Sequence, residues 1–306
     1  MELWIPITIA AAFSQNVRSA LQKHLKGALS TSGATLARFV YAAPLAVLYA
    51  VGLHMAGLEL PSPNPTFTIY AMIGGLSQIL ATALLVSLFS HRNFAVGTAY
   101  SKSEALQTAV FGVVILGESI SSGAAFGIVV SLTGVMAISV GSGQVSLRTL
   151  IAGLTQRTAV VGLASGAFFG VSAVTYRAAS LGLDGGEVVM RAAFTLAFAT
   201  VFQTIVMSVY MRLREPGEFT NTLRAWRVAA LVGLSGMVAS ACWFTAMTMQ
   251  NAAYVRALGQ IELVFTFIVS YFVFRERSTK LEVIGIALVI AGIVLLLLLG
   301  DGGASR

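Results

Sequence analysis

The chain has 306 residues, of which 57% are hydrophobic and 10% charged, and its formal net charge is +7. With a mean hydropathy of +0.86, this composition excludes a soluble globular protein, because too few polar side chains remain to cover a water-facing surface. The basic residues are scattered rather than gathered in a stripe, so nucleic acid is not an expected partner. A single cysteine, Cys242, excludes an internal disulfide and a cysteine-based metal site. The composition predicts an all-α integral membrane protein surrounded by a lipid bilayer.

Ten apolar segments have roughly the 20 residues that a membrane-spanning helix needs. The first is not expected to be a cleaved signal peptide, since Met1 and Glu2 provide no basic start and polar residues such as Gln15 and Asn16 follow. The polar stretch 142–158 is expected to be a cytoplasmic linker between a first unit, 1–141, and a second unit, 159–306. The ten segments are 3–21, 34–53, 67–89, 94–116, 124–140, 159–179, 188–211, 226–249, 252–274 and 283–299.

Most basic residues fall in the loops on one side of the predicted membrane. By the positive-inside rule this side is cytoplasmic, which places both termini outside. We therefore expect a multi-pass protein of the bacterial inner membrane. The basic residues on the predicted cytoplasmic side are Lys23, Lys26, Arg92, Arg148, Arg157, Arg212, Arg214, Arg224, Arg227, Arg275, Arg277 and Lys280.

The fourth predicted helix recurs in the ninth. Residues 93–118 align without a gap with residues 251–276, so that Glu104 and Glu118 correspond to Glu262 and Glu276. Because five helices are an odd number, the second half enters the membrane from the opposite side. The sequence therefore predicts ten transmembrane helices as two inverted five-helix repeats around a midplane site, an arrangement typical of secondary transporters.

These features resemble the EamA-type members of the drug/metabolite transporter superfamily over nearly the whole chain. The resemblance implies two five-helix repeats and the transport of a small metabolite, and it leaves the substrate open. Many members have a proline after the mid-helix glutamate, where this sequence has Ala105 and Leu263, so no proline signals a helix break there. The residues that carry the resemblance are Glu104, Glu118, Glu262 and Glu276, with Arg38 and Arg191 early in the second helix of each half.

Glu104 and Glu262 are the strongest candidates for a functional role. Glu104 lies eleven residues past Asn93, about 16 Å along a helix and thus near the bilayer centre. An ionised carboxylate there costs at least about 2.5 kcal/mol, so it must face a polar cavity, pair with a cation or be protonated. Protonation would make both glutamates proton-coupling residues. The alternative is that they bond to neighbouring helices and only hold the fold together.

Further polar residues of the predicted helices are candidates for binding a substrate. Lys102 and Glu104 are two residues apart and face different neighbours. Arg256 either faces the site or extends to the membrane interface, and Trp243 either stacks on a substrate or packs in the interior. Arg38 and Arg191 suit either partners in a gate or interfacial anchors, and the anchor interpretation is favoured. The predicted substrate-binding residues are Gln15, Asn16, Gln78, Tyr100, Lys102, Glu104, Trp243, Arg256, Gln260 and Glu262.

Small residues predict close packing of the fifth and tenth helices. Gly123, Gly127, Ser131 and Gly134 form one face of the fifth helix, and Gly285 and Gly292 repeat part of it on the tenth. These faces are expected to pack within one protomer or between two, and a homodimer through them is one expectation. Pro44 should kink the second helix, because proline lacks an amide donor and crowds the preceding turn.

The sequence favours a secondary transporter over other classes of protein. Lys102 and Arg256 suggest an amino-acid-like substrate, an organic anion or a zwitterion, moved by alternating access. No phosphate-binding motif for ATP is present, so an ion gradient or exchange would supply the energy, and no cofactor is expected. One alternative is a membrane-embedded enzyme, which the separate loop positions of His24, His54 and His91 disfavour. The other is a channel or scaffold.

Overall fold

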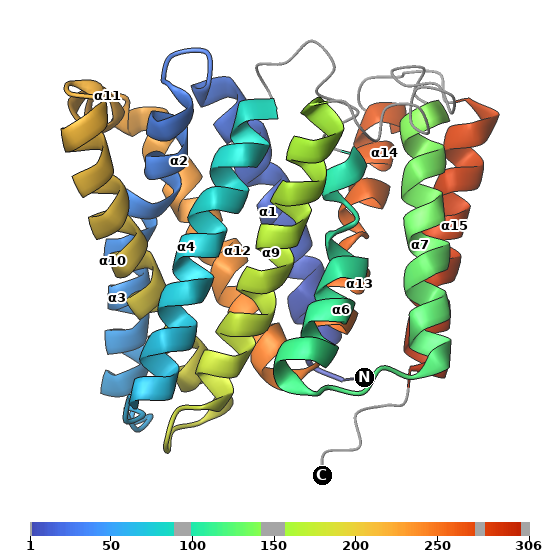
Figure 1. The fold of residues 1–306 in the computed structure, drawn as a ribbon, viewed down its shortest axis with the longest axis horizontal. Coiled ribbons are helices and arrows are strands. Elements are labelled where there is room, and N and C mark those ends of the chain that lie inside the picture. The colour runs from blue at the N-terminus through green and yellow to red at the C-terminus, as the bar shows by residue number, and fades with distance from the viewer. Residues whose placement is uncertain (1, 89–98, 142–156, 273–278, 301–306) are drawn as a thin grey trace.

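The computed structural model describes residues 2–88, 99–141, 157–272 and 279–300, and these form a bundle of α-helices (Figure 1). The described residues contain no strand, apart from one isolated bridge between Ser62 and Asp184. The helices are α1 Trp4–Leu25, α2 Thr31–Val40, α3 Ala42–Met55, α4 Pro65–Leu88, α6 Glu104–Leu116, α7 Ser122–Gly141, α9 Arg157–Leu181, α10 Val188–Arg214, α11 Glu218–Arg224, α12 Trp226–Met249, α13 Ala252–Gly259, α14 Glu262–Phe272 and α15 Lys280–Leu299.

Seven helical segments of the described residues are long and apolar enough to cross a membrane. One of them joins α2 and α3 into Thr31–Met55, interrupted at Tyr41, three residues before Pro44. The missing amide of Pro44 accounts for this interruption, as the sequence predicted. The seven segments are Thr31–Met55, Pro65–Leu88, Ser122–Val140, Arg157–Leu181, Val188–Arg214, Trp226–Met249 and Lys280–Leu299.

The count of ten membrane helices stays a prediction, because three of the predicted segments take a different form. The first is α1, whose 22 residues include several polar ones, and the fourth and ninth are each divided into two shorter parts. The predicted linker lies almost wholly outside the described residues. So do several residues used in the sequence argument, namely His91, Arg92, Asn93, Arg148, Arg275, Glu276 and Arg277.

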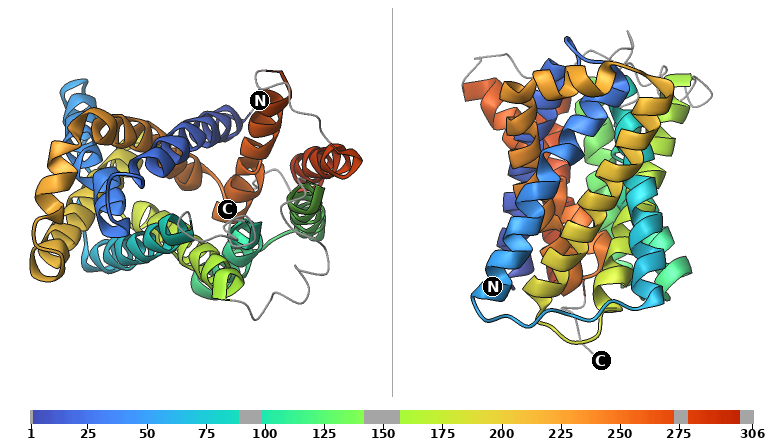
Figure 2. Two further views of the ribbon diagram at one scale, coloured as in Figure 1. Left: turned by 90° about the horizontal axis from the view of Figure 1, so that it is seen from above. Right: turned by 90° about the vertical axis from the view of Figure 1, so that its left-hand side faces the viewer.

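Most helices run side by side between two ends of the bundle (Figure 1). The start of α1 and the end of α15 both lie at the lower end in this view. α6 runs towards the lower end, whereas α13 and α14 run towards the upper end. Extensive contacts along their lengths join α4 with α9, α1 with α12, and α7 with α15. The view from above shows α7 and α15 together at one end of an elongated cross-section (Figure 2).

Large apolar side chains are exposed on the outside of the bundle. Leu48, Val114 and Leu298 have relative exposures of 65%, 76% and 75%, whereas the polar side chain of Gln203 is fully buried. In water such an apolar surface would drive association, but in lipid it is the expected exterior, with backbone groups satisfied inside helices. The chain is therefore a multi-pass membrane protein.

The small-residue faces of α7 and α15 pack against each other within the chain. A Cβ atom added at Gly127 would lie 2.7 Å from the carbonyl oxygen of Gly292, and one at Gly134 would lie 2.6 Å from that of Gly285. Only glycine permits two helix backbones to approach so closely. These faces contact each other within the chain in this conformation, and a homodimer through them stays an untested prediction.

Two helices of the bundle are interrupted at equivalent positions. In the first half, residues 99–101 are helical, Lys102 and Ser103 form a turn, and α6 begins at Glu104. In the second half, α13 ends at Gly259 and α14 begins at Glu262. Tighter hydrogen bonds close both turns, from the Ser103 amide to the Tyr100 carbonyl at 3.1 Å and from the Ile261 amide to the Leu258 carbonyl at 3.0 Å. The breaks occur without proline, so the sequence pattern did not predict them.

Candidate binding cavity

A cavity of about 210 Å³ lies inside the bundle, where both interrupted helices meet α1, α2, α4, α9 and α12. Its wall is polar for a membrane protein interior, and it includes six charged side chains. The residues that line it are Gln15, Asn16, Arg18, Ser19, Arg38, Gln78, Leu85, Ser101, Lys102, Glu104, Phe169, Ser240, Trp243, Phe244, Met247, Arg256, Glu262 and Leu263. Eight of the ten residues predicted to bind a substrate are among them.

The helix breaks position the two glutamates at this cavity. Glu104 is the first residue of α6 and Glu262 is the first residue of α14. A carboxylate in the first turn of a helix interacts favourably with the partial positive charge of the helix N-terminus. At the first break, the Ser103 hydroxyl satisfies one backbone group locally, since it donates to the Tyr100 carbonyl at 2.6 Å.

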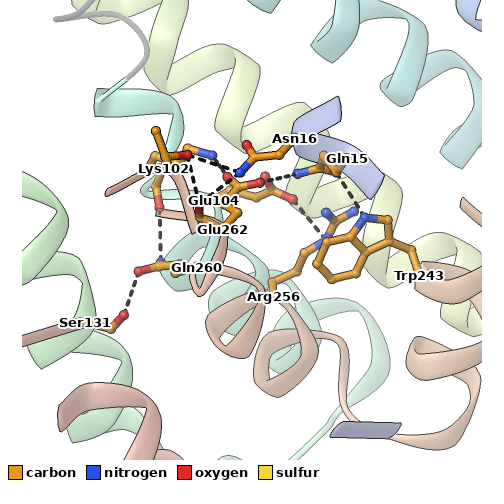
Figure 3. Close-up of polar contacts among 10 residues, drawn as sticks. Gln15, Asn16, Lys102, Glu104, Ser131, Trp243, Arg256, Gln260 and Glu262 are labelled. Atoms are coloured by element: carbon orange, nitrogen blue, oxygen red, sulfur yellow. Dashed lines mark hydrogen bonds and ion pairs between the residues drawn. The ribbon is translucent and has the colours of Figure 1, made fainter. Parts of the chain in front are cut away.

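Glu262 lies at the centre of a polar network with partners from both halves of the chain (Figure 3). One of its carboxylate oxygens forms an ion pair with the Lys102 ammonium. The other accepts a hydrogen bond from the Gln15 amide at 3.1 Å. Asn16 donates to the Glu262 backbone carbonyl at 2.9 Å and to the Thr266 hydroxyl at 3.1 Å. Residues of α1 therefore hold the start of α14 in place.

Glu104, from the first half of the chain, pairs with Arg256 from the second half. Arg256 Nε lies 3.0 Å from Glu104 Oε1, although the N–H direction does not meet hydrogen-bond geometry. The guanidinium carbon also lies 4.5 Å from the centroid of the Trp243 ring, a cation–π distance. Trp243 Nε1 in turn donates to Gln15 Oε1 at 3.0 Å. Arg256 therefore points into the cavity rather than towards the membrane interface, and the Trp243 ring is part of the wall.

Each glutamate is thus paired with a cation from the other half of the chain. Lys102 of the first half meets Glu262 of the second, and Arg256 of the second meets Glu104 of the first. Charges removed from water need such partners, and loss of one partner of a buried pair is far more costly than loss of both. The two pairs join the interrupted helices to each other across the cavity.

Two predicted site residues lie away from the main cavity. Tyr100 packs against Ala159, Met136 and neighbouring apolar residues, which removes its ring from the cavity wall. Gln260 lines a smaller adjoining pocket of about 30 Å³. It accepts a hydrogen bond from the Ser131 hydroxyl at 2.6 Å and donates to the Lys102 carbonyl at 3.5 Å. Gln260 therefore links the two helix breaks, and its side-chain amide is occupied by protein groups.

Two arginines outside the predicted set of substrate-binding residues also line the cavity. Arg38 was interpreted as an interfacial anchor, but it is 5% exposed and lines the cavity. Arg18 is 3% exposed and lines it as well. By contrast, Arg191 stays near the start of α10, where its Nε donates to the carbonyls of Gly185 and Gly186 at 2.9 and 3.0 Å. An arginine near a helix end has the same sequence pattern whether it lines a cavity or lies at the membrane interface. Only the packing of the helices distinguishes the two positions.

Gln78 reaches the cavity from α4 and is held by a buried network. Its side-chain oxygen accepts hydrogen bonds from Gln203 at 2.9 Å and from the Tyr176 hydroxyl at 3.3 Å. Gln203 also donates to the Gly75 carbonyl at 3.2 Å. The orientation of Gln78 is therefore set by α9 and α10.

A further ion pair joins Arg177 of α9 to Glu118, in the segment after α6. Arg177 Nε donates to Glu118 Oε1 at 2.5 Å, and its Nη1 donates to the carbonyls of Met247 and Gln250 at 2.5 and 2.8 Å. One side chain thereby connects α9, the segment after α6 and the end of α12. Within the described part of the chain, no group of three His, Cys, Asp or Glu residues could hold a metal ion.

Comparison with known proteins agrees with a membrane transporter fold. Residues 156–298 match the model of the EamA-like transporter family, as the sequence resemblance predicted. No curated protein matches the sequence. A solved structure described only as "Crystal structure of protein" aligns with a TM-score of 0.72 at 16% sequence identity, covering 98% of this chain and 99% of that chain. At this identity the likeness concerns the fold alone.

Proposed function

We propose that the protein is a secondary transporter of a small, negatively charged or zwitterionic metabolite. The match of residues 156–298 to the model of the EamA-like transporter family supports this proposal. The observation that carries this proposal is the cavity between the two interrupted helices, with a carboxylate at each break and a cation from the opposite half against each carboxylate. Broken helices around a central polar site are a recurring feature of secondary transporters, where they expose backbone groups and helix ends to solutes.

We further propose that the halves are inverted repeats that expose the cavity alternately to the two sides of the membrane. The opposite directions of α6 and of α13 with α14 support this arrangement (Figure 1). So does the matched position of the two breaks, each directly before a glutamate. The contact of Arg177 with Glu118 and with the end of α12 fits a conformation that is closed at the lower end.

The distribution of charge supports a bacterial inner-membrane orientation with the upper end in the cytoplasm. The upper end holds the last turns of α1 and α10 and the first turns of α9, α12 and α15 (Figure 1). These turns include Lys23, Arg157, Arg212, Arg227 and Lys280. Under the positive-inside rule, both termini are then on the outer side.

Proton coupling through Glu104 and Glu262 is the energy source that we propose. Each carboxylate has a cation partner in this conformation, and proton uptake would require the pair to open, which would link protonation to the relative position of the halves. Neutral glutamine in place of either glutamate would remove the titratable group but preserve side-chain size. We therefore expect both substitutions to abolish dependence on a pH gradient.

Uptake into proteoliposomes tests the proposed function. The purified chain is reconstituted and offered labelled amino acids and organic acids, with and without an imposed pH gradient. We expect the native protein to accumulate at least one solute, with Glu104→Gln and Glu262→Gln at least about tenfold slower, since each removes a charge from a site of low dielectric. Glu187→Gln, an exposed position before α10, is the control and should transport normally. Transport of no solute under either condition would contradict the proposal, as would normal gradient-driven transport by both glutamine variants.

A further inference from the structure

The charges around the cavity do not balance. Among the described residues that line it, four side chains are basic, namely Arg18, Arg38, Lys102 and Arg256, and two are acidic, Glu104 and Glu262. The two carboxylates form ion pairs with Lys102 and Arg256. Arg18 and Arg38 are thereby left as an excess of two positive charges on the cavity wall.

Both remaining arginines are buried and have few protein partners. Arg18 is 3% exposed, and its Nε has no hydrogen-bond acceptor. Arg38 is 5% exposed, donates from Nη1 to the Thr82 hydroxyl at 2.7 Å and lies 5.4 Å from the centroid of the Phe39 ring. Burial of a charge is costly unless an opposite charge or several hydrogen bonds compensate for it. Neither a hydroxyl nor an aromatic ring supplies the missing negative charge.

The two arginines approach the cavity side by side across Gly236 of α12. A Cβ atom added at Gly236 would lie 3.4 Å from Arg18 Cδ and 3.8 Å from Arg38 Cγ. The side-chain stems of both residues therefore cross the same point of α12, one from α1 and one from α2. Guanidinium groups are planar, remain protonated and match the geometry of carboxylate and phosphate oxygens in two-point contacts.

We propose that Arg18 and Arg38 form the substrate-selecting anion site of this cavity and that the substrate is a small organic dianion. This inference rests on the proposed transport function and narrows it. A substrate with two negative charges would neutralise the excess charge of the cavity, whereas a zwitterionic amino acid would leave it unchanged. The cavity volume of about 210 Å³ limits the substrate to a small metabolite.

A series of ligands with one shape and different charge tests this proposal on the native, full-length protein. Succinate, its monoamide succinamate and its diamide succinamide carry two, one and no negative charges at about pH 7.5. Glycerol 3-phosphate and glycerol form a second pair that separates phosphate esters from dicarboxylates. We expect succinate or glycerol 3-phosphate to raise the unfolding temperature in detergent by at least about 2 °C. The uncharged compounds should have no effect, and succinamate should have less effect than succinate.

Variants of the two arginines complete the test. Arg18→Gln and Arg38→Gln should each require about 10- to 100-fold more of the effective dianion for the same stabilisation, as expected for loss of a charged hydrogen bond. Arg18→Lys, which keeps the charge, should lose less. Arg224→Gln, an exposed position on α11, should bind like the native protein. A variant that fails to fold is recognised by the loss of its single symmetric peak on size-exclusion chromatography.

The outcomes separate this inference from the proposed function. Failure of both dianions to stabilise the native protein more than their uncharged counterparts would overturn the dianion assignment. An equal shift with sodium chloride at matched ionic strength would overturn it too, since a simple counter-ion would then suffice. If the protein nevertheless transports an amino acid in a Glu262-dependent manner, the transport function stands and only the substrate class is wrong. If no solute is transported at all, both fail.

Discussion

The exchange of ion-pair partners between the halves is the main feature of the site at the scale of single residues. Glu104 and Glu262 are equivalent in the sequence repeat, but their partners, Arg256 and Lys102, are not. The repeat alone could identify the glutamates, because a shared acidic residue in an apolar helix is unusual. It could not identify the pairing, which depends on how the two breaks pack against each other. The position of Arg38 in the cavity wall, rather than at the membrane interface, depends on the same packing.

A double-mutant cycle measures the pair of Lys102 and Glu262. Glu262→Gln should lower the free energy of unfolding by about 1–3 kcal/mol, because the Lys102 ammonium loses its carboxylate partner. The Lys102 side chain is 25% exposed, so the cost is smaller than for a fully buried pair. The double variant with Lys102→Gln should lose less than the sum of the single variants. Unfolding in mixed micelles by a denaturing detergent provides the free energies.

The control cycle combines Lys102→Gln with Glu187→Gln. Glu187 is exposed at the start of α10, and the two effects should add within about 0.5 kcal/mol. Additive losses for Lys102 and Glu262 as well would argue against a stabilising ion pair in the folded protein.

At the scale of helices, the sequence predicted the contact of α7 with α15 but not the helix breaks. Glycine spacing identified the close contact directly, since only residues without a side chain permit it. The breaks at Lys102 and Gln260 have no proline to mark them. They are stabilised instead by polar contacts that come from distant parts of the chain, such as the bond of Gln260 to the Lys102 carbonyl. Such tertiary contacts are not visible in local sequence patterns.

Alanine substitution tests the contact of α7 with α15. Gly127→Ala would place a methyl group 2.7 Å from the Gly292 carbonyl oxygen and 2.8 Å from the Leu296 amide nitrogen. Because these are backbone atoms, the helices must move apart, and we expect a loss of about 1–3 kcal/mol in unfolding free energy. At Gly52 in α3 an added Cβ meets nothing within 4 Å, so Gly52→Ala should be neutral or should stabilise by up to about 1 kcal/mol. Equal stability of the two variants would contradict the close contact.

At the scale of the whole molecule, the composition of the chain accounts for its class and the packing accounts for its site. The excess of apolar residues predicted a membrane protein, and the exposed side chains of Leu48, Val114 and Leu298 form the corresponding outer surface. Within the described residues, many polar side chains gather instead around an internal cavity. Eight of the ten predicted substrate-binding residues line it, because an apolar helix tolerates a polar side chain only where the interior provides partners. The excess positive charge of the cavity emerged only from the assembled structure.

Two-sided thiol labelling tests most directly whether this cavity opens to both sides of the membrane. Ser19, which lines the cavity and is partly exposed, is replaced by cysteine in a Cys242→Ser background. A membrane-impermeant thiol reagent is then added to right-side-out and to inside-out vesicles. As controls, Asn221→Cys on α11 and Glu187→Cys before α10 are exposed at opposite ends of the bundle, and each should react in one type of vesicle only. Alternating access predicts that Ser19→Cys reacts in both types; reaction in one type alone, with and without a pH gradient, would contradict it.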